Sequence, residues 1–167
     1  MVPRRHRSQE LLSRLPVGPV VGAEIGILRG YMSKALLSRN DLVLFMVDNW
    51  KEIPDLEHKD IALKQTDFAA DRRHVLHLDS VAAASTIQDG TLDFVFIDAD
   101  HSYRGVSSDI EAWLPKLRRN GLLCGHDYNN KNIEEGVDVK RAVDEFVSSH
   151  GGILDCGSDS TWFMRMQ

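Results

Sequence analysis

The sequence predicts an α/β fold in which one doubly wound sheet carries helices on both faces. Apolar runs of strand length alternate with helical patterns along the chain, which is typical of such a sheet. The run over residues 42–48 is nearly unbroken, as expected for a parallel strand that is buried on both faces. The chain has 167 residues, 43% hydrophobic and 27% charged, which suits one globular domain. We expect seven strands in a mixed sheet, because an antiparallel pair follows five parallel strands.

Residues 1–17 are expected to form an N-terminal tail and a short helix, and residues 18–167 the ligand-binding domain. The basic start, residues 1–7, is interpreted as a frayed, solvated end. No apolar segment follows it, so we do not expect a secretory signal. Leucines between residues 8 and 15 predict a short helix, which prolines break at residues 16–19.

The stretch from Val20 to Gly30 is predicted to be a buried strand, a glycine turn and the start of a helix. Gly26 and Gly30 allow the backbone to approach a ligand closely. Glu24 is unusual in this apolar strand: it either points to water or meets a cationic group of a ligand. The glycines recur as G-x-x-x-G and lack the G-x-G-x-x-G spacing of dinucleotide-binding proteins, which disfavours a nicotinamide cofactor.

The remaining elements follow the same alternation. Residues 51–73 show only a hint of a helix, near residues 61–65, and are the least informative part of the chain. Helices are expected at residues 81–85, 103–118 and 139–147, and Gly121 provides a stop signal after the second. Strands are expected at residues 42–48, 74–78, 92–97 and 122–124, followed by an antiparallel pair at 153–157 and 161–166.

Composition excludes several classes of function. The net charge of -5 argues against a general nucleic-acid-binding protein, which would be basic. Two cysteines are too few for a disulfide framework and suit a reducing compartment, so we expect a cytoplasmic protein. No run of about 18 apolar residues is present, so no membrane span is expected.

Polar residues follow each of the first five predicted strands. They are Glu24 and Gly26, Asp48, Asp79 and Ser80, Asp98 with Asp100 and His101, and His126 with Asp127. Open α/β sheets bind ligands at the carboxyl ends of their strands, so these residues predict one site. Asp48 lies 22 positions after Gly26, where a carboxylate can bind ribose hydroxyls. Asp79 and Ser80 suit an N-cap as well as a ligand contact.

The pattern resembles the class I S-adenosylmethionine-dependent methyltransferases, whose fold is a Rossmann-like, doubly wound, seven-stranded mixed sheet. The resemblance covers residues 18–167. The sequence is similar above all to the small-molecule O-methyltransferases of the macrocin-like, sugar- and antibiotic-tailoring subgroup. The motifs are Glu24-Ile25-Gly26, Asp48, the run from Phe96 to Tyr103, Asp109-Ile110, Trp113-Leu114-Pro115, Gly121, and Gly125-His126-Asp127-Tyr128.

The resemblance implies binding of S-adenosylmethionine and a small-molecule acceptor with a hydroxyl group. Glu24 and Gly26 would line its methionine part, and Asp48 would hold the ribose. Asp79 and Ser80 would lie near the adenine. Asp98 would lie near the sulfonium and the transferred methyl group.

In metal-dependent relatives, the residues that match Asp98, His126 and Asp127 hold a divalent cation. The residue at position 126 is commonly Asp or Glu there, and imidazole favours softer metals than Mg²⁺. His101, three residues after Asp98, is the best candidate base because its ordinary pKa is near neutrality. A surface position for His101 and a packing role for His126 are the alternatives.

Two other functions compete with the O-methyltransferase: a nicotinamide-dependent oxidoreductase of Rossmann type, and a non-catalytic binding protein with a cofactor fold. The strand-end cluster of carboxylates and histidines disfavours the second, because a scaffold has no need for it. We also expect a homodimer that shields the acceptor pocket, with Trp113 as a candidate for the interface. No nucleic-acid or membrane partner is expected.

Overall fold

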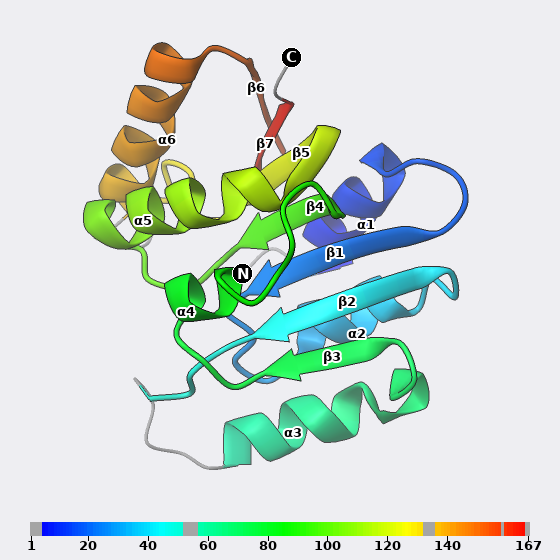
Figure 1. Cartoon of the computed structure of the whole chain (residues 1–167). Helices are drawn as coiled ribbons and strands as arrows, with labels where there is room; N and C mark the ends of the chain where they lie inside the picture. The colour runs from blue at the N-terminus through cyan, green and yellow to red at the C-terminus, as the bar shows by residue number, and fades with distance from the viewer. Residues whose placement is uncertain (1–4, 52–56, 132–135, 158, 166–167) are drawn as a thin grey trace.

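The computed structural model describes residues 5–51, 57–131, 136–157 and 159–165, which form one sheet with helices on both faces (Figure 1). The strands are β1 (Val20–Ile25), β2 (Leu42–Val47), β3 (Arg73–Leu76), β4 (Leu92–Ile97), β5 (Leu117–Gly125), β6 (Ile153–Cys156) and β7 (Trp162–Arg165). The helices are α1 (Arg5–Arg14), α2 (Tyr31–Leu37), α3 (Glu57–Gln65), α4 (Ser80–Ala84), α5 (Tyr103–Trp113) and α6 (Gly136–His150), with 3-10 turns η1 (Asp67–Ala69) and η2 (Leu114–Lys116).

The sheet confirms the predicted topology. Within the described residues it has seven strands in the order β3-β2-β1-β4-β5-β7-β6. Strands β1 to β5 are parallel, and β7 is antiparallel to both β5 and β6. The chain runs outward from β1 in one direction and then returns to place β4 on its other side. This reversal leaves a crevice at the carboxyl ends of β1 and β4, where doubly wound sheets bind ligands.

Two apolar layers cover the sheet. One packs α4, α5 and α6 against side chains such as Val95 and Leu123, and the other packs α1, α2 and α3 against Phe94 and Phe96. Every residue of β4 is buried, as expected for a central strand with helices on both faces. In Figure 1, α1 and α2 lie behind the sheet, and α5 and α6 lie on the opposite side.

The predicted helix over 103–118 is too long. Helix α5 ends at Trp113, a 3-10 turn covers Leu114–Lys116, and β5 already begins at Leu117. Pro115 ends the α-helix because it has no amide hydrogen to donate. Asn120 adopts a positive φ of 62°, where β5 turns before its buried half. The weak pattern in residues 51–73 is resolved as α3 and η1, except that residues 52–56 lie outside the described part.

Helix α1 is longer than predicted, and its N-terminal part is not a solvated tail in the described residues. The Arg7 side chain is 12% exposed and contacts two carboxylates. Trp113 is fully buried in the core, and its Nε1 donates a hydrogen bond to Ser80. It cannot contribute to a subunit interface, so the homodimer stays a prediction without this support. No helix in the described ranges is long and apolar enough to span a lipid bilayer.

Candidate functional site

A pocket of about 700 Å³ lies at the carboxyl ends of the parallel strands. Five of the residues predicted for the cofactor line it: Gly26, Asp48, Asp79, Ser80 and Asp98. His101 also lines this pocket. The rule that polar residues at parallel strand ends converge on one site therefore holds for these residues.

Asp48 binds the backbone of the glycine turn. Its Oδ2 accepts hydrogen bonds from the amides of Ile27 and Leu28 at 2.8 and 2.9 Å, and its Oδ1 accepts one from Trp50 at 2.6 Å. The carboxylate lies on the pocket wall, as the ribose-binding prediction requires, and it also holds the turn in shape. A substitution at Asp48 would therefore change both the charge and the form of the pocket.

Gly26 is required by its surroundings. Its φ is +91°, and a Cβ there would lie 2.1 Å from the carbonyl oxygen of Asp98. The ends of β1 and β4 are thus in direct backbone contact, and the Asp98 amide donates to the carbonyl of Ile25 at 2.8 Å. The contact places Asp98 beside the glycine turn.

Asp79 and Ser80 combine a structural role with a place on the pocket wall. Asp79 caps α4 by accepting from the Val81 amide at 3.2 Å, and Ser80 accepts from Trp113. The buried carboxyl of Asp109 also lines the pocket, and burial raises its pKa to about 6. The sequence motif contained Asp109, but its helical position gave no sign that it would face the pocket.

Two predicted cofactor residues lie elsewhere. Glu24 is 2% exposed, faces α2, and accepts a hydrogen bond from Ser33 at 2.6 Å. It neither points to water nor lines the pocket. Gly30 packs against α3, where a Cβ would lie 2.9 Å from the Cα of Ala62. These two residues support the turn and its helix from behind the site.

Burial raises the pKa of Glu24 to about 8 from 4.5, so its carboxyl is neutral at pH 7. The unfolded chain loses this proton near pH 4.5, whereas the folded chain keeps it, so stability falls as pH rises from 4.5 to 8. The wild-type protein should lose stability of the order of 3 kcal/mol over this range, and we expect Glu24→Gln, which cannot ionise, to lack this loss. Urea unfolding of both proteins at pH 5 and pH 8 measures the difference. Equal pH dependence in the two proteins would show that Glu24 ionises normally in the fold.

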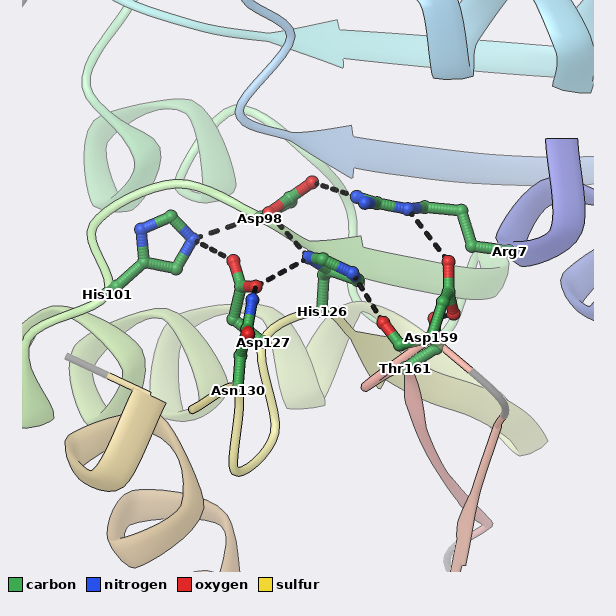
Figure 2. A network of polar contacts seen from close by, with 8 residues as sticks. All are labelled: Arg7, Asp98, His101, His126, Asp127, Asn130, Asp159 and Thr161. Carbon is green, nitrogen blue, oxygen red and sulfur yellow. Dashed lines mark hydrogen bonds and ion pairs between the residues drawn. The ribbon is translucent and has the colours of Figure 1, made fainter. Parts of the chain in front are cut away.

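A second group of site residues surrounds Asp98 on the side of β5 (Figure 2). We call Asp98, His101 and Asp127 the Asp–His–Asp cluster, because one ligand atom from each lies within 4.8 Å of the others. Nε2 of His101 is 2.8 Å from Oδ2 of Asp127 and 3.4 Å from Oδ1 of Asp98. His101 and Asp98 also belong to the pocket wall, so the cluster adjoins the pocket directly.

His126 holds the other oxygen of Asp127. Its Nδ1 is 2.9 Å from Oδ1 of Asp127 and 3.8 Å from Oδ1 of Asp98. Its Nε2 is 2.7 Å from the carbonyl oxygen of Asp159, which can only accept, so Nε2 carries a hydrogen. Asn130 donates to the same Asp127 oxygen at 2.6 Å. The grouping therefore differs from the predicted metal set, because His101 lies nearest the two carboxylates and His126 orients one of them.

The electrostatics of the cluster are strongly coupled. Hydrogen bonds to Asp127 and Asp98 raise the pKa of His101 to about 10. Burial opposes ionisation of Asp127, but hydrogen bonds from His101, His126 and Asn130 outweigh it and lower the Asp127 pKa. At neutral pH the cluster thus holds a protonated imidazole between two carboxylates. In this state His101 cannot accept a proton, contrary to the reason for choosing it as a base.

The donor atoms of the cluster fit a divalent cation. Two carboxylate oxygens and one imidazole nitrogen suit Mn²⁺ and similar metals, and Mg²⁺ less well. Asp127 has one oxygen held by surrounding donors and the other turned into the cluster. Such support is usual around metal-binding carboxylates and histidines.

Sequence reasoning missed Arg7 and Asp159. Nη1 of Arg7 is 2.8 Å from Oδ2 of Asp98, and its Nε is 3.3 Å from Oδ2 of Asp159. The two residues are 152 positions apart, so no local spacing could pair them. Arg7 belonged to the basic start that was interpreted as a solvated end, and Asp159 to a predicted turn, so both had simpler explanations.

Comparisons with known proteins bear on this site. A family model described as a methyltransferase domain matches residues 23–128, which is more than half of the chain. A comparison with curated proteins finds no match.

Several solved structures share the fold. A protein from Corynebacterium glutamicum has a TM-score of 0.75 at 17% identity, covering 99% of this chain and 81% of that one. A methyltransferase from Podospora anserina with bound S-adenosylhomocysteine (SAH) has a TM-score of 0.73 at 14% identity, with 98% and 76% covered. An O-methyltransferase from Bacillus cereus in complex with SAH has a TM-score of 0.64 at 19% identity, with 100% and 93% covered.

Proposed function

This chain belongs to the methyltransferase-domain family and has the class I methyltransferase fold, and from this we propose that it transfers a methyl group from S-adenosylmethionine to a hydroxyl of a small molecule. One observation carries the proposal: the Asp–His–Asp cluster shares Asp98 and His101 with the wall of the pocket. A methyl donor in the pocket would present its methyl group toward the groups that could hold an acceptor oxygen. Transfer forms a C–O bond, breaks the S–CH₃ bond and leaves SAH and one proton.

The pocket suits the donor in size and chemistry. A volume of about 700 Å³ lies within the range of cofactor sites. Asp48, Asp79 and Ser80 line this pocket, and we assign Asp48 to the ribose hydroxyls and Asp79 and Ser80 to the adenine. Two structures with this fold contain SAH, which supports the same cofactor here. The Bacillus cereus protein is an O-methyltransferase, which favours oxygen as the acceptor atom.

Asp98, His101 and Asp127 would hold a divalent cation, with His126 as the residue that orients Asp127. The cation would lower the pKa of the acceptor hydroxyl and orient its oxygen. Positioning of the acceptor in line with the S–CH₃ bond would supply much of the rate. The sugar- and antibiotic-tailoring class of acceptor, which the sequence motif suggests, remains part of this proposal.

His101 has two exclusive roles in this proposal. As a cation ligand it needs a free Nε2 and cannot also bind the acceptor proton there. As a base without a cation it must first lose the proton that Asp98 and Asp127 stabilise. The raised pKa favours the ligand role, because a cation can replace that proton between the same carboxylates.

The cofactor is tested by calorimetry with SAH. We expect Asp48→Asn to weaken SAH binding by about 10- to 100-fold, because an amide cannot accept all the hydrogen bonds that fix the turn and bind ribose. Asp89→Asn serves as the control, because Asp89 pairs with Lys116 at 2.6 Å away from the pocket. Unchanged SAH affinity in Asp48→Asn would show that Asp48 does not contribute to cofactor binding. Binding of NAD in place of SAH would favour the oxidoreductase.

The reaction is tested by transfer of a labelled methyl group from S-adenosylmethionine to a panel of sugars, phenols and macrolide alcohols. Transfer should stop in chelator and return with Mn²⁺ or Mg²⁺. Full transfer in the presence of chelator would support the methyltransferase activity but would show that no cation is required. SAH binding without transfer to any hydroxyl, amine or thiol would favour the non-catalytic binding protein.

A further inference from the structure

The two carboxylates of the Asp–His–Asp cluster are held in the same way from opposite sides. Oδ1 of Asp127 accepts a hydrogen bond from Asn130 and contacts His126, whereas Oδ2 faces His101. Oδ2 of Asp98 pairs with Arg7, whereas its Oδ1 faces His101, as Figure 2 shows. Arg7 thus does for Asp98 what Asn130 and His126 do for Asp127. Each carboxylate is left with one oxygen for the centre of the cluster.

Arg7 comes from a separate part of the chain. It lies on α1, outside residues 23–128 that match the family model, so the match assigns it no role. Its side chain is nevertheless only 12% exposed. An arginine on the first helix of a protein usually remains solvated, because burial of a charge is costly without a partner. The burial of this guanidinium indicates that the fold holds it at Asp98.

Asp159 anchors this arrangement from the C-terminal hairpin. Its Oδ2 pairs with Nε of Arg7, and its Oδ1 accepts a hydrogen bond from Thr161. Its carbonyl oxygen binds Nε2 of His126. A single residue between β6 and β7 therefore fixes both Arg7 and His126, which in turn hold Asp98 and Asp127. The Asp159 side chain is 4% exposed, so its charge needs Arg7 whether or not a cation is bound.

The contacts of Asp98 are also consistent with Arg7 remaining in place beside a cation. Arg7 contacts Oδ2 of Asp98, and Oδ1 of the same carboxylate faces the centre of the cluster. A guanidinium and a cation can share a carboxylate, one on each oxygen. Arg7 therefore need not leave Asp98 when an ion binds to Oδ1.

We propose that Arg7 is a positioning residue, which fixes Asp98 as a one-oxygen ligand for the cation of the Asp–His–Asp cluster. This inference rests on the proposed cation site. Loss of Arg7 has two opposite effects on cation affinity. Removal of a nearby positive charge strengthens binding, whereas free rotation of Asp98 weakens it. Outer residues that orient ligands typically contribute 10- to 100-fold in metal affinity, so orientation should dominate.

The test measures Mn²⁺ affinity and SAH affinity of the full chain by calorimetry. We expect Arg7→Met to weaken Mn²⁺ binding by about 10-fold and to leave SAH affinity unchanged, because Arg7 does not line the pocket. Arg14→Met is the matched control: Arg14 lies on the same helix and pairs with Asp155 of the same hairpin at 2.5 Å. It should leave both affinities unchanged. Unchanged or tighter Mn²⁺ binding in Arg7→Met would overturn the inference.

A second variant covers the case in which Arg7→Met does not fold and binds no SAH. Arg7→Lys keeps the charge of Asp159 paired, but its single nitrogen cannot bridge Asp98 and Asp159 as the guanidinium does. We expect it to bind SAH normally and Mn²⁺ several-fold more weakly than the wild-type protein. Wild-type Mn²⁺ affinity in Arg7→Lys would overturn the positioning role. If the wild-type protein binds SAH but no Mn²⁺, the proposed cation site is wrong, and so is the role of Arg7 that rests on it.

Discussion

Replacement of Gly26 by alanine is expected to lower SAH affinity by about 100-fold and to destabilise the fold by about 3 kcal/mol. The added Cβ would lie 2.1 Å from the carbonyl oxygen and 2.5 Å from the carbonyl carbon of Asp98. Both are backbone atoms of the residue that directly follows β4, so the overlap cannot be relieved by rotation of a side chain. The ends of β1 and β4 would have to separate, and these ends form the pocket wall next to Asp98.

Gly18 provides a control with a similar φ but no atom close to an added Cβ. Its φ is +94°, and a Cβ there would meet nothing within 4 Å. Gly18→Ala should therefore lose only the cost of a positive φ, roughly 1–2 kcal/mol, and keep its SAH affinity. Calorimetry and thermal unfolding of both variants separate backbone strain from steric overlap. Equal stability of the two variants, or wild-type SAH affinity in Gly26→Ala, would refute the close contact between β1 and β4.

Elements with strong local patterns could be predicted from the sequence alone. The run over 92–97 is buried on both faces as β4, because a central parallel strand accommodates a segment that is apolar except for Asp93. The antiparallel pair at the C-terminus is also present, as β6 and β7. The end of α5 was missed because the apolar spacing continues past Trp113, although Pro115 prevents the helix from continuing.

The pocket was predictable for a different reason. Parallel strands end at one edge of the sheet, so Asp48, Asp79 and Asp98 had to converge wherever the individual strands began. Glu24 is the exception, because side chains alternate along a strand and its own points toward α2 rather than along the edge. A carboxylate in an apolar strand signals a specific partner, and here that partner is Ser33.

The outer part of the site could not be predicted from spacing. Arg7, Asp98 and Asp159 come from α1, the end of β4 and the hairpin between β6 and β7, and they meet only after the sheet has formed. His101 and His126 were identified as site residues, but their roles depend on angles at the two carboxylates. Sequence order cannot distinguish the histidine that lies between Asp98 and Asp127 from the one that orients Asp127.

The role of His101 leads to the second large effect: Mn²⁺ affinity should rise about tenfold for each pH unit between pH 6 and pH 8. Hydrogen bonds to Asp127 and Asp98 raise the pKa of His101 to about 10, so the ring is protonated throughout this range. A cation that binds Nε2 must displace that proton, and protons therefore compete with the cation more strongly at lower pH. The affinity should change by about 100-fold over the two units, with about one proton released per ion.

Calorimetry at pH 6, 7 and 8, in two buffers with different heats of ionisation, counts the released proton. In His101→Asn the pH dependence should largely disappear, because an amide oxygen can bind the ion without giving up a proton. His74 is an exposed histidine on β3, far from the cluster, so His74→Asn should keep the pH dependence of the wild-type protein. A wild-type affinity that does not vary with pH would exclude His101 as a ligand. An undiminished pH dependence in His101→Asn would mean that another group, with His126 the nearest candidate, releases the proton.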